Sequence, residues 1–305
     1  MKINRLMSVV LAFTTGCAVL GQKSAEKPVG THYSAAFINN NGKLIVFPFN
    51  GDPIAIDLPT RVGGMTFSAS GRIIYGGVQP SSAGPPLAAV TIKPSGVRPL
   101  LGSNGFDALN SLTVDSAEDI AIVSATYEHE GAFECGLFVL DIKSGTVQKI
   151  LDNLTPSCFP LSSWADLSAS PDGKRVVGTA GRGQIGVVNI KERKIEKLWP
   201  GTAAWWSPDG KWIAALTFAN HMEIELIRAS DLSIQRHLGN GGNLRWSPDS
   251  RYLLVLDHGW CGLGSGYVGT LQTLDIETGE RRAIKSSECK VNLMTTGWVS
   301  DEVLE

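Results

Sequence analysis

The chain has 305 residues, a formal net charge of −2 and 43% hydrophobic residues. A charge so close to neutral gives no electrostatic reason to expect a nucleic-acid partner. With 34 glycines and only 18% charged residues, the composition is more typical of a turn-rich β protein than of a helical one.

Residues 1–21 are predicted to be a secretory signal peptide. A basic start is followed by residues 6–20, which are mostly apolar but too short and too interrupted to predict a membrane span. Cleavage after Gly21 would leave residues 22–305 as a mature periplasmic or secreted chain with no transmembrane segment. The alternative is a lipoprotein signal, in which Cys17 would carry a lipid anchor.

Three stretches in the second half of the chain are nearly identical. They are SASPDGKRVVG from Ser168, WSPDGKWIAAL from Trp206 and WSPDSRYLLVL from Trp246. Their aspartates are 37 and 40 residues apart, which is typical of architectures that repeat one supersecondary unit. Each stretch places a turn between two apolar strands, because Pro presets φ and Asp can bond the backbone ahead of it.

Weaker copies of this turn occur in the rest of the chain. They are FSASGRIIYGG from Phe67, VDSAEDIAIVS from Val114 and GWVSDE from Gly297. A second hairpin follows every copy except the last, so the predicted unit has four strands. In chain order, we expect three strands in 31–59, complete units at about 63–101, 109–153, 164–200, 202–239 and 242–288, and a single strand in 292–301.

The incomplete units at the two ends of the chain complement each other. Residues 292–301 supply the first strand that residues 31–59 lack, and pairing them removes the exposed edges of an open array. The predicted fold is therefore an all-β, six-bladed β-propeller closed by one C-terminal strand and three N-terminal strands. A sandwich of many short strands is the alternative, and the regular period argues against it.

The Ser-Pro-Asp-Gly-Lys turns resemble the WD40-like repeats of TolB-type propellers and of the propeller domains of prolyl oligopeptidases. The resemblance implies a propeller that covers nearly all of the mature chain as a single domain. The sequence matches the repeat motif closely only at residues 170–174, 207–211 and 247–251. We find neither the N-terminal domain of TolB nor the hydrolase domain of the oligopeptidases in the sequence. The motifs specify a turn, so neither function is implied.

HGWCGLGSGYVG, at 258–269, contains the spacing G-x-G-x-x-G. A dinucleotide site requires a helix after these glycines, because the pyrophosphate binds at the helix N-terminus. The alternating apolar residues and the Thr-Gly turn that follow predict a strand instead. We therefore interpret this stretch as a long connection between the second and third strands of its blade, and we expect no cofactor.

Four cysteines remain after Cys17, and export favours their oxidation. Two of them fall between the second and third strands of their blades and two follow the fourth strands, so we predict the disulfides Cys135–Cys158 and Cys261–Cys289. Four buried free thiols are the alternative. A metal site is disfavoured because no Cys-x-x-Cys occurs.

Polar side chains on the innermost strands are the best candidates for a ligand site. Alternate positions before the serine of each turn are small or polar, as expected of a strand with one wetter side. We expect them to approach the central channel toward the face with the long loops, and the ligand-binding candidates are Asp166, Trp205, Asn243 and Arg245. A hydrated channel with an Asp166–Arg245 pair and no ligand is the alternative.

Further polar residues are predicted in loops on that same face. They are His129, His221, His258 and Trp260. His129 lies between two glutamates, but adjacent loop residues rarely all point inward and no H-E-x-x-H is present, so we predict solvated side chains rather than a metal site.

The sequence favours an exported, non-catalytic binding or scaffold module for a protein, peptide or glycan partner, because a propeller presents loops from many blades on one rigid disc. The alternative is a channel-site hydrolase or a lactonase-like, metal-dependent enzyme. Calcium would need several oxygen ligands, and the inner positions offer one carboxylate, Asp166, and one amide, Asn243. No G-x-S-x-G is present, and we assign no catalytic residue.

Overall fold

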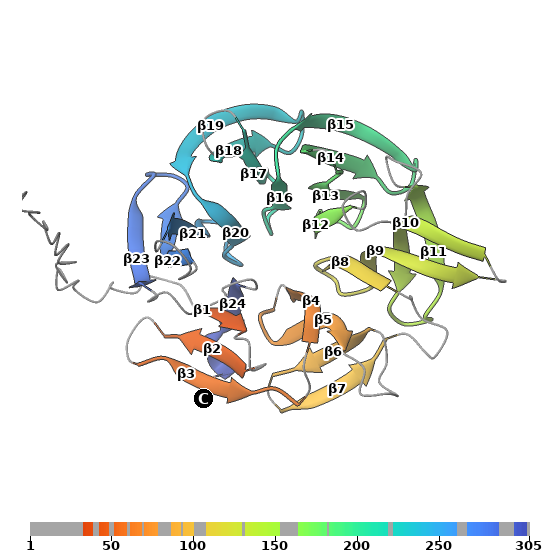
Figure 1. The fold of residues 1–305 in the computed structure, drawn as a ribbon, viewed down its shortest axis with the longest axis horizontal. Helices are drawn as coiled ribbons and strands as arrows, with labels where there is room; N and C mark the ends of the chain where they lie inside the picture. Colours follow the sequence, from red (N-terminus) through yellow and green to blue (C-terminus); the bar gives the residue numbers. More distant parts are fainter. Residues whose placement is uncertain are drawn as a thin grey trace, which may run out of the picture.

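The fold is a ring of six four-stranded antiparallel sheets (Figure 1). It is seen in a computed structural model that describes residues 33–38, 43–48, 52–59, 62–68, 70–78, 87–92, 94–100, 108–129, 132–152, 164–181, 183–218, 222–260, 267–286 and 296–303. These residues are nearly all in strands, with one short 3-10 helix, η2 (Asp301–Val303). The prediction of a six-bladed β-propeller is confirmed.

Each blade contains four strands, and the first strand of each blade lies nearest the centre of the ring (Figure 1). Blade 1 consists of β24 (Thr296–Ser300), β1 (Tyr33–Ile38), β2 (Lys43–Phe47) and β3 (Ile54–Asp57). Blade 2 consists of β4 (Val62–Phe67), β5 (Ile73–Val78), β6 (Ala88–Thr91) and β7 (Gly96–Pro99). Blade 3 consists of β8 (Ala108–Val114), β9 (Ile120–His129), β10 (Ala132–Asp141) and β11 (Val147–Asp152).

The other three blades follow in chain order. Blade 4 consists of β12 (Ala165–Ala169), β13 (Arg175–Thr179), β14 (Gln184–Asn189) and β15 (Lys194–Pro200). Blade 5 consists of β16 (Ala203–Trp206), β17 (Trp212–Thr217), β18 (Glu223–Arg228) and β19 (Ser233–Asn240). Blade 6 consists of β20 (Gly242–Trp246), β21 (Tyr252–Trp260), β22 (Tyr267–Asp275) and β23 (Arg281–Ser286).

The Ser-Pro-Asp turns connect the first and second strands of blades 4, 5 and 6. In blade 4, the Ser170 hydroxyl donates to Asp172 Oδ1 at 2.7 Å and accepts the backbone N–H of Arg175 at 2.9 Å. Gly173 has a φ of +66°, which glycine adopts at little cost. The repeated motif is therefore a turn closed by its own side chains.

Blade 1 joins the two ends of the chain. β24 pairs antiparallel with β1 and places Trp298 opposite Ala35. Beyond the strand, the Ser34 hydroxyl donates to Asp301 Oδ1 at 2.6 Å, and Glu302 forms an ion pair with Arg72 of blade 2. The predicted closure by one C-terminal and three N-terminal strands is confirmed.

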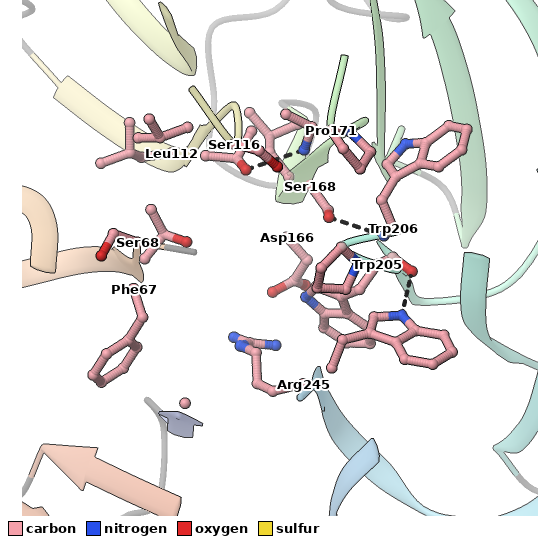
Figure 2. Close-up of a pocket in the computed structure, with 18 of the residues that line it drawn as sticks. Phe67, Ser68, Leu112, Ser116, Asp166, Ser168, Pro171, Trp205, Trp206 and Arg245 are labelled. Atoms are coloured by element: carbon pink, nitrogen blue, oxygen red, sulfur yellow. Dashed lines mark hydrogen bonds between the residues drawn. The ribbon is translucent and has the colours of Figure 1, made fainter. Parts of the chain in front are cut away.

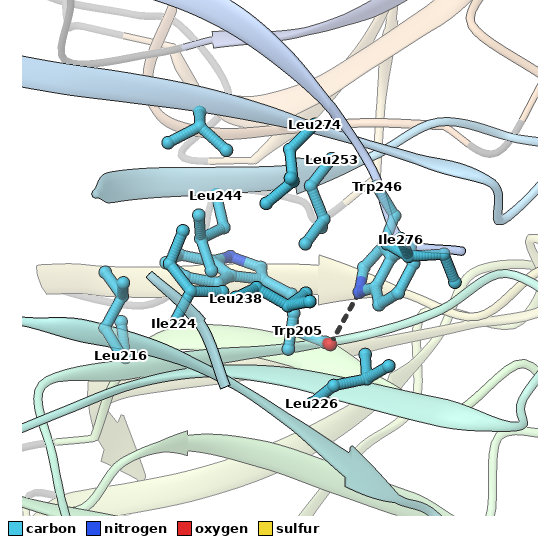
Figure 3. Packing of buried hydrophobic residues seen from close by; sticks show 13 residues of the cluster. Trp205, Leu216, Ile224, Leu226, Leu238, Leu244, Trp246, Leu253, Leu274 and Ile276 are labelled. Carbon is cyan, nitrogen blue, oxygen red and sulfur yellow. Dashed lines mark hydrogen bonds between the residues drawn. The ribbon is translucent and has the colours of Figure 1, made fainter. Parts of the chain in front are cut away.

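Apolar side chains fill the spaces between neighbouring blades. The cluster in Figure 3 joins blades 5 and 6 around Trp205 and Trp246, whose side chains are both almost fully buried. Trp246 Nε1 donates across the interface to the carbonyl of Trp205 at 2.9 Å, and Trp298 Nε1 donates to the carbonyl of Arg245 at 3.2 Å. Trp246 and Trp298 thus pack the blades together and also satisfy their own indole N–H groups.

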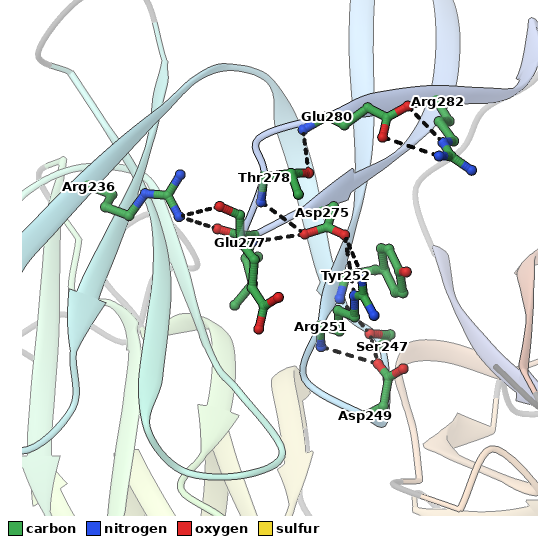
Figure 4. A network of polar contacts seen from close by, with 11 residues as sticks. Arg236, Ser247, Asp249, Arg251, Tyr252, Asp275, Glu277, Thr278, Glu280 and Arg282 are labelled. Carbon is green, nitrogen blue, oxygen red and sulfur yellow. Dashed lines mark hydrogen bonds and ion pairs between the residues drawn. The ribbon is translucent and has the colours of Figure 1, made fainter. Parts of the chain in front are cut away.

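Charged side chains hold the turns at the outer edge of blade 6 (Figure 4). Asp275 Oδ1 accepts the backbone N–H groups of Glu277 and Thr278 at 2.9 and 3.1 Å, while its Oδ2 pairs with Arg251 at 3.2 Å. Arg236 of blade 5 donates to the carbonyls of Ile276 and Glu277. This turn therefore also connects two blades.

The second and third strands of blades 3 and 6 extend further than predicted. β9 ends at His129, and β21 continues through His258 to Trp260, which pairs with Tyr267 at the start of β22. The backbones of His129, His258 and Trp260 therefore lie in strands and not in loops, because continued pairing satisfies the backbone groups of both strands. Gly269 lies within β22, so a strand follows the glycine-rich stretch, as predicted.

Across the described parts of the chain, we find no helix with the length and apolar character that crossing a bilayer requires.

Candidate functional site

A pocket of about 320 Å³ lies where the innermost strands converge (Figure 2). Every blade contributes to its lining, from Gly297 of blade 1 to Arg245 of blade 6. The lining also reaches Pro171, Pro208 and Pro248 of the Ser-Pro-Asp turns. The described lining thus includes the turn side of the ring, whereas we expected the site toward the opposite, long-loop face.

Two charged side chains, Asp166 and Arg245, lie in this lining, and the described lining contains no other ionisable group. Burial raises the pKa of Asp166, against the opposing charge of Arg245. Burial likewise lowers the pKa of Arg245, against the charge of Asp166. Asp166 is nevertheless solvent-exposed in the pocket and Arg245 is half-buried, so the pocket is open to water at both side chains.

The two charges do not neutralise each other by direct contact. No ion pair within 4.0 Å joins Asp166 to Arg245 in the described structure, and none of its hydrogen bonds uses the Asp166 carboxylate. Figure 2 shows both side chains directed into the same part of the pocket. The pocket therefore offers one anion and one cation to a third group.

Arg245 is held in place by its own blade and by the preceding one, blade 5. Its Nη1 donates to the carbonyl of Leu244 at 2.7 Å, and its guanidinium carbon lies 4.9 Å from the centre of the Trp205 ring. A guanidinium over an indole face is an attractive cation–π arrangement. Trp205, with 7% exposure, mainly belongs to the core between blades 5 and 6 and supports Arg245 from beneath.

Asp166 and Asn243 share an unusual backbone conformation. Their φ angles are +47° and +48°, and the strand pairing shifts register at both positions. Aspartate and asparagine tolerate this left-handed conformation better than most residues. Asp166 lines the pocket, whereas Asn243 is half-buried and is not among the lining residues.

Three hydroxyls of the lining hold adjacent inner strands together, a role that the sequence analysis did not anticipate. Ser111 and Thr113 of blade 3 accept the backbone N–H groups of Leu167 and Ala169, at 3.0 and 3.1 Å. Ser168 of blade 4 accepts that of Trp206 at 2.9 Å. These small polar residues follow the predicted alternation, but alternation alone does not say which hydroxyls a neighbouring strand uses.

The remaining candidate residues are placed only in part. His129, His258 and Trp260 have described backbones on β9 and β21, while His221, Cys158, Cys261 and Cys289 lie outside the described residues. Cys135 lies on β10 and is disulfide-bonded, and the two pairings stay predictions. Among described residues, no group of three His, Cys, Asp or Glu side chains is arranged to hold a metal.

The ring and its Ser-Pro-Asp turns define a six-bladed β-propeller. No protein-family model and no curated protein matches the sequence. Among solved structures, a protein assigned as TolB from Agrobacterium tumefaciens superimposes with a TM-score of 0.55 and 15% identity, covering 84% of this chain and 89% of its own. Its likeness shows the fold, that of a TolB-type propeller.

A second solved structure, hydrazine synthase from Kuenenia stuttgartiensis, gives a TM-score of 0.48 and 17% identity. The match covers 73% of this chain and 66% of that one. A similarity at this level supports no argument about function.

Neutralising Asp166 is expected to stabilise the free protein at neutral pH. Because burial raises the pKa of Asp166 above 3.8, its folded state binds the proton more tightly than its unfolded state does. The ionised carboxylate therefore costs stability above that raised pKa, and the cost disappears as the pH falls to the unfolded value. Asp166→Asn should raise Tm at neutral pH and leave it unchanged at about pH 3 in thermal unfolding. A lower Tm at neutral pH would instead reveal a stabilising partner for the carboxylate.

Proposed function

We propose that this chain is an exported, non-catalytic binding module that holds a peptide partner at the pocket on the axis of the ring. One observation carries the proposal: Asp166 and Arg245 line the same pocket, and no direct ion pair within 4.0 Å joins them in the described structure. Charges in such a place are costly unless a partner compensates them. A bound partner with charges of its own would supply that compensation.

A peptide suits these two side chains better than a neutral glycan does. A carboxylate attracts the ammonium or guanidinium of a peptide, and a guanidinium binds carboxylates through two parallel hydrogen bonds. A neutral sugar can donate and accept hydrogen bonds, but it leaves both charges without a counterion. Between a peptide and a neutral glycan, the charges of the pocket therefore favour the peptide.

Export is the second part of the proposal. It is supported by the signal-like segment at 1–21 and by the disulfide at Cys135, since disulfides persist in oxidising compartments. We assign the pairs Cys135–Cys158 and Cys261–Cys289 to the mature protein. Mass spectrometry of peptides from the non-reduced protein would test this assignment, and a peptide that links Cys135 to Cys261 or Cys289 would refute it.

The binding site is tested by capture from an envelope extract. Immobilised protein spanning residues 22–305 should retain a partner, and the double variant Asp166→Asn with Arg245→Gln should retain at least about tenfold less, because each lost charged contact costs a bound complex over 1 kcal/mol. Quantitative mass spectrometry of the eluate measures retention.

The matched control is the double variant Arg228→Gln with Asp231→Asn, which removes an exposed ion pair of 3.2 Å on blade 5. Like the pocket variant, it removes one positive and one negative charge, but far from the axis of the ring. It should therefore retain as much partner as the unaltered protein. Thermal unfolding confirms that both variants are folded. Equal retention by the pocket variant and the control would remove the axial pocket as the binding site.

A further inference from the structure

We propose that the ligand held at the axial pocket is a small zwitterion of the amino-acid type, a free amino acid or a dipeptide whose ammonium and carboxylate groups both enter the pocket. This inference rests on the proposed function and narrows its ligand from a peptide in general to one with both chain ends free. It follows from the number of charges, their fixed positions and the size of the cavity.

The charge count of the lining points to a ligand that is neutral overall but carries both signs. Asp166 supplies one negative charge and Arg245 one positive charge, and the described lining has no other. A ligand with a single charge would leave the other side chain unpaired in the cavity, which is unfavourable. Nucleotides and other polyanions would in addition be repelled by Asp166.

The two charges stand on different blades, and the contacts of a third blade hold one of them, Arg245. Asp166 stands on the inner strand of blade 4 and Arg245 on that of blade 6, with Trp205 of blade 5 beneath the guanidinium. The hydrogen bond from Arg245 to the Leu244 carbonyl, at 2.7 Å, further restrains the side chain. Arg245 is thereby kept from collapsing onto Asp166, and the two groups can receive the opposite ends of one short molecule.

The other residues of the pocket offer a hydroxyl donor, an aromatic surface and enough volume for a ligand of this kind. Ser168 accepts a backbone N–H, but its own O–H proton stays available as a donor to a carboxylate. Phe67 supplies an aromatic surface and packs over Gly297, where a Cβ atom would meet its ring at 2.2 Å. The volume of about 320 Å³ lies at the low end of the range for small-molecule sites, which matches a ligand of one or two residues.

The proposal is tested by screening the purified protein, residues 22–305, against the standard amino acids and the dipeptides Gly-Leu and Gly-Phe. A bound ligand raises Tm, because it binds only the folded state. The best ligand is then compared by titration calorimetry with its N-acetyl form, which lacks the cation, and its amide form, which lacks the anion. We expect both blocked forms to bind at least about tenfold more weakly, a difference of roughly 1.4 kcal/mol.

Variants of the two charged residues show which of them binds the ammonium group of the ligand and which binds its carboxylate. Asp166→Asn should bind the free and N-acetyl forms about equally, and Arg245→Gln should bind the free and amide forms about equally. The control pair Arg228→Gln with Asp231→Asn should keep the full preference of the unaltered protein. A merely structural role of the two residues would lower all affinities together and would not produce this crossed pattern.

Three outcomes separate this inference from the proposed function. If no zwitterion binds, or if the blocked forms bind as well as the free ones, the ligand assignment is overturned. If charge-dependent capture from the extract persists in that case, the proposed peptide-binding function stands without it. If the crossed pattern is found while capture is independent of charge, the ligand assignment stands and the extract partner binds elsewhere.

Discussion

Deletion of residues 296–305 is expected to abolish cooperative folding of the ring. The deletion removes β24, the innermost strand of blade 1, and with it the buried side chains of Trp298 and Val299. Losing a buried tryptophan alone costs about 3–5 kcal/mol, against a total stability of about 5–15 kcal/mol for a typical domain. It also leaves β1 as an unpaired edge facing the channel.

The measurement is thermal and urea unfolding followed by circular dichroism, together with size-exclusion chromatography to detect aggregation through the new edge. A chain that ends at Ser300 is the matched control. It keeps β24, and the described contacts that it loses include the Ser34–Asp301 hydrogen bond, the Arg72–Glu302 ion pair and the bond from the Glu302 N–H to the Ser300 hydroxyl, which are partly exposed. Surface pairs contribute about 1 kcal/mol or less each, so this control should still unfold cooperatively.

A synthetic peptide of residues 296–305 gives a second, independent test. Added to the shortened chain, it should restore the native spectrum, because β24 pairs with β1 through backbone hydrogen bonds that a separate peptide can also form. A shortened chain that folds cooperatively without the peptide would show that the closing strand is dispensable.

The fold could be predicted from the sequence because its turns have a recognisable motif. Ser170, Pro171 and Asp172 specify a hairpin through contacts within the motif, so the same letters give the same turn wherever they occur. Their regular spacing then fixed the repeat, and the count of strands at the two ends fixed the closure. Strand lengths were harder to predict: β21 runs to Trp260 because its pairing with β22 continues as far as the Trp260–Tyr267 pair.

The pocket residues could be predicted only in part. The prediction assumed that side chains alternate strictly between the two faces of a strand, and this holds only for regular strands. At Asp166 and Asn243 the positive φ angles and the shifts in pairing interrupt the strand, and the two residues do not end up in equivalent places. Trp205 was expected as a ligand residue, but packing between blades takes most of its surface. Composition along a strand cannot reveal which side of it the next blade will cover.

The largest effect expected of a single substitution is at Gly136, in the third strand of blade 3. Its φ of +148° lies in a region that is essentially restricted to glycine, and a Cβ atom there would lie 2.1 Å from the carbonyl oxygen of Leu151 on the adjacent strand. The obstacle is backbone, so the strand pair itself must separate. We expect Gly136→Ala to cost about 3 kcal/mol or more and to lower Tm by roughly 5 °C or more.

Gly145→Ala, in the turn that follows the same strand, separates the two causes of this loss. Gly145 also has a positive φ, +73°, but a Cβ atom there meets nothing within 4 Å. It should therefore show only the cost of the conformation, about 1–2 kcal/mol. Thermal unfolding of both variants measures the difference. If the two lose equal stability, the close approach of Leu151 to Gly136 has no energetic consequence, and the register of β10 against β11 would need to be revised.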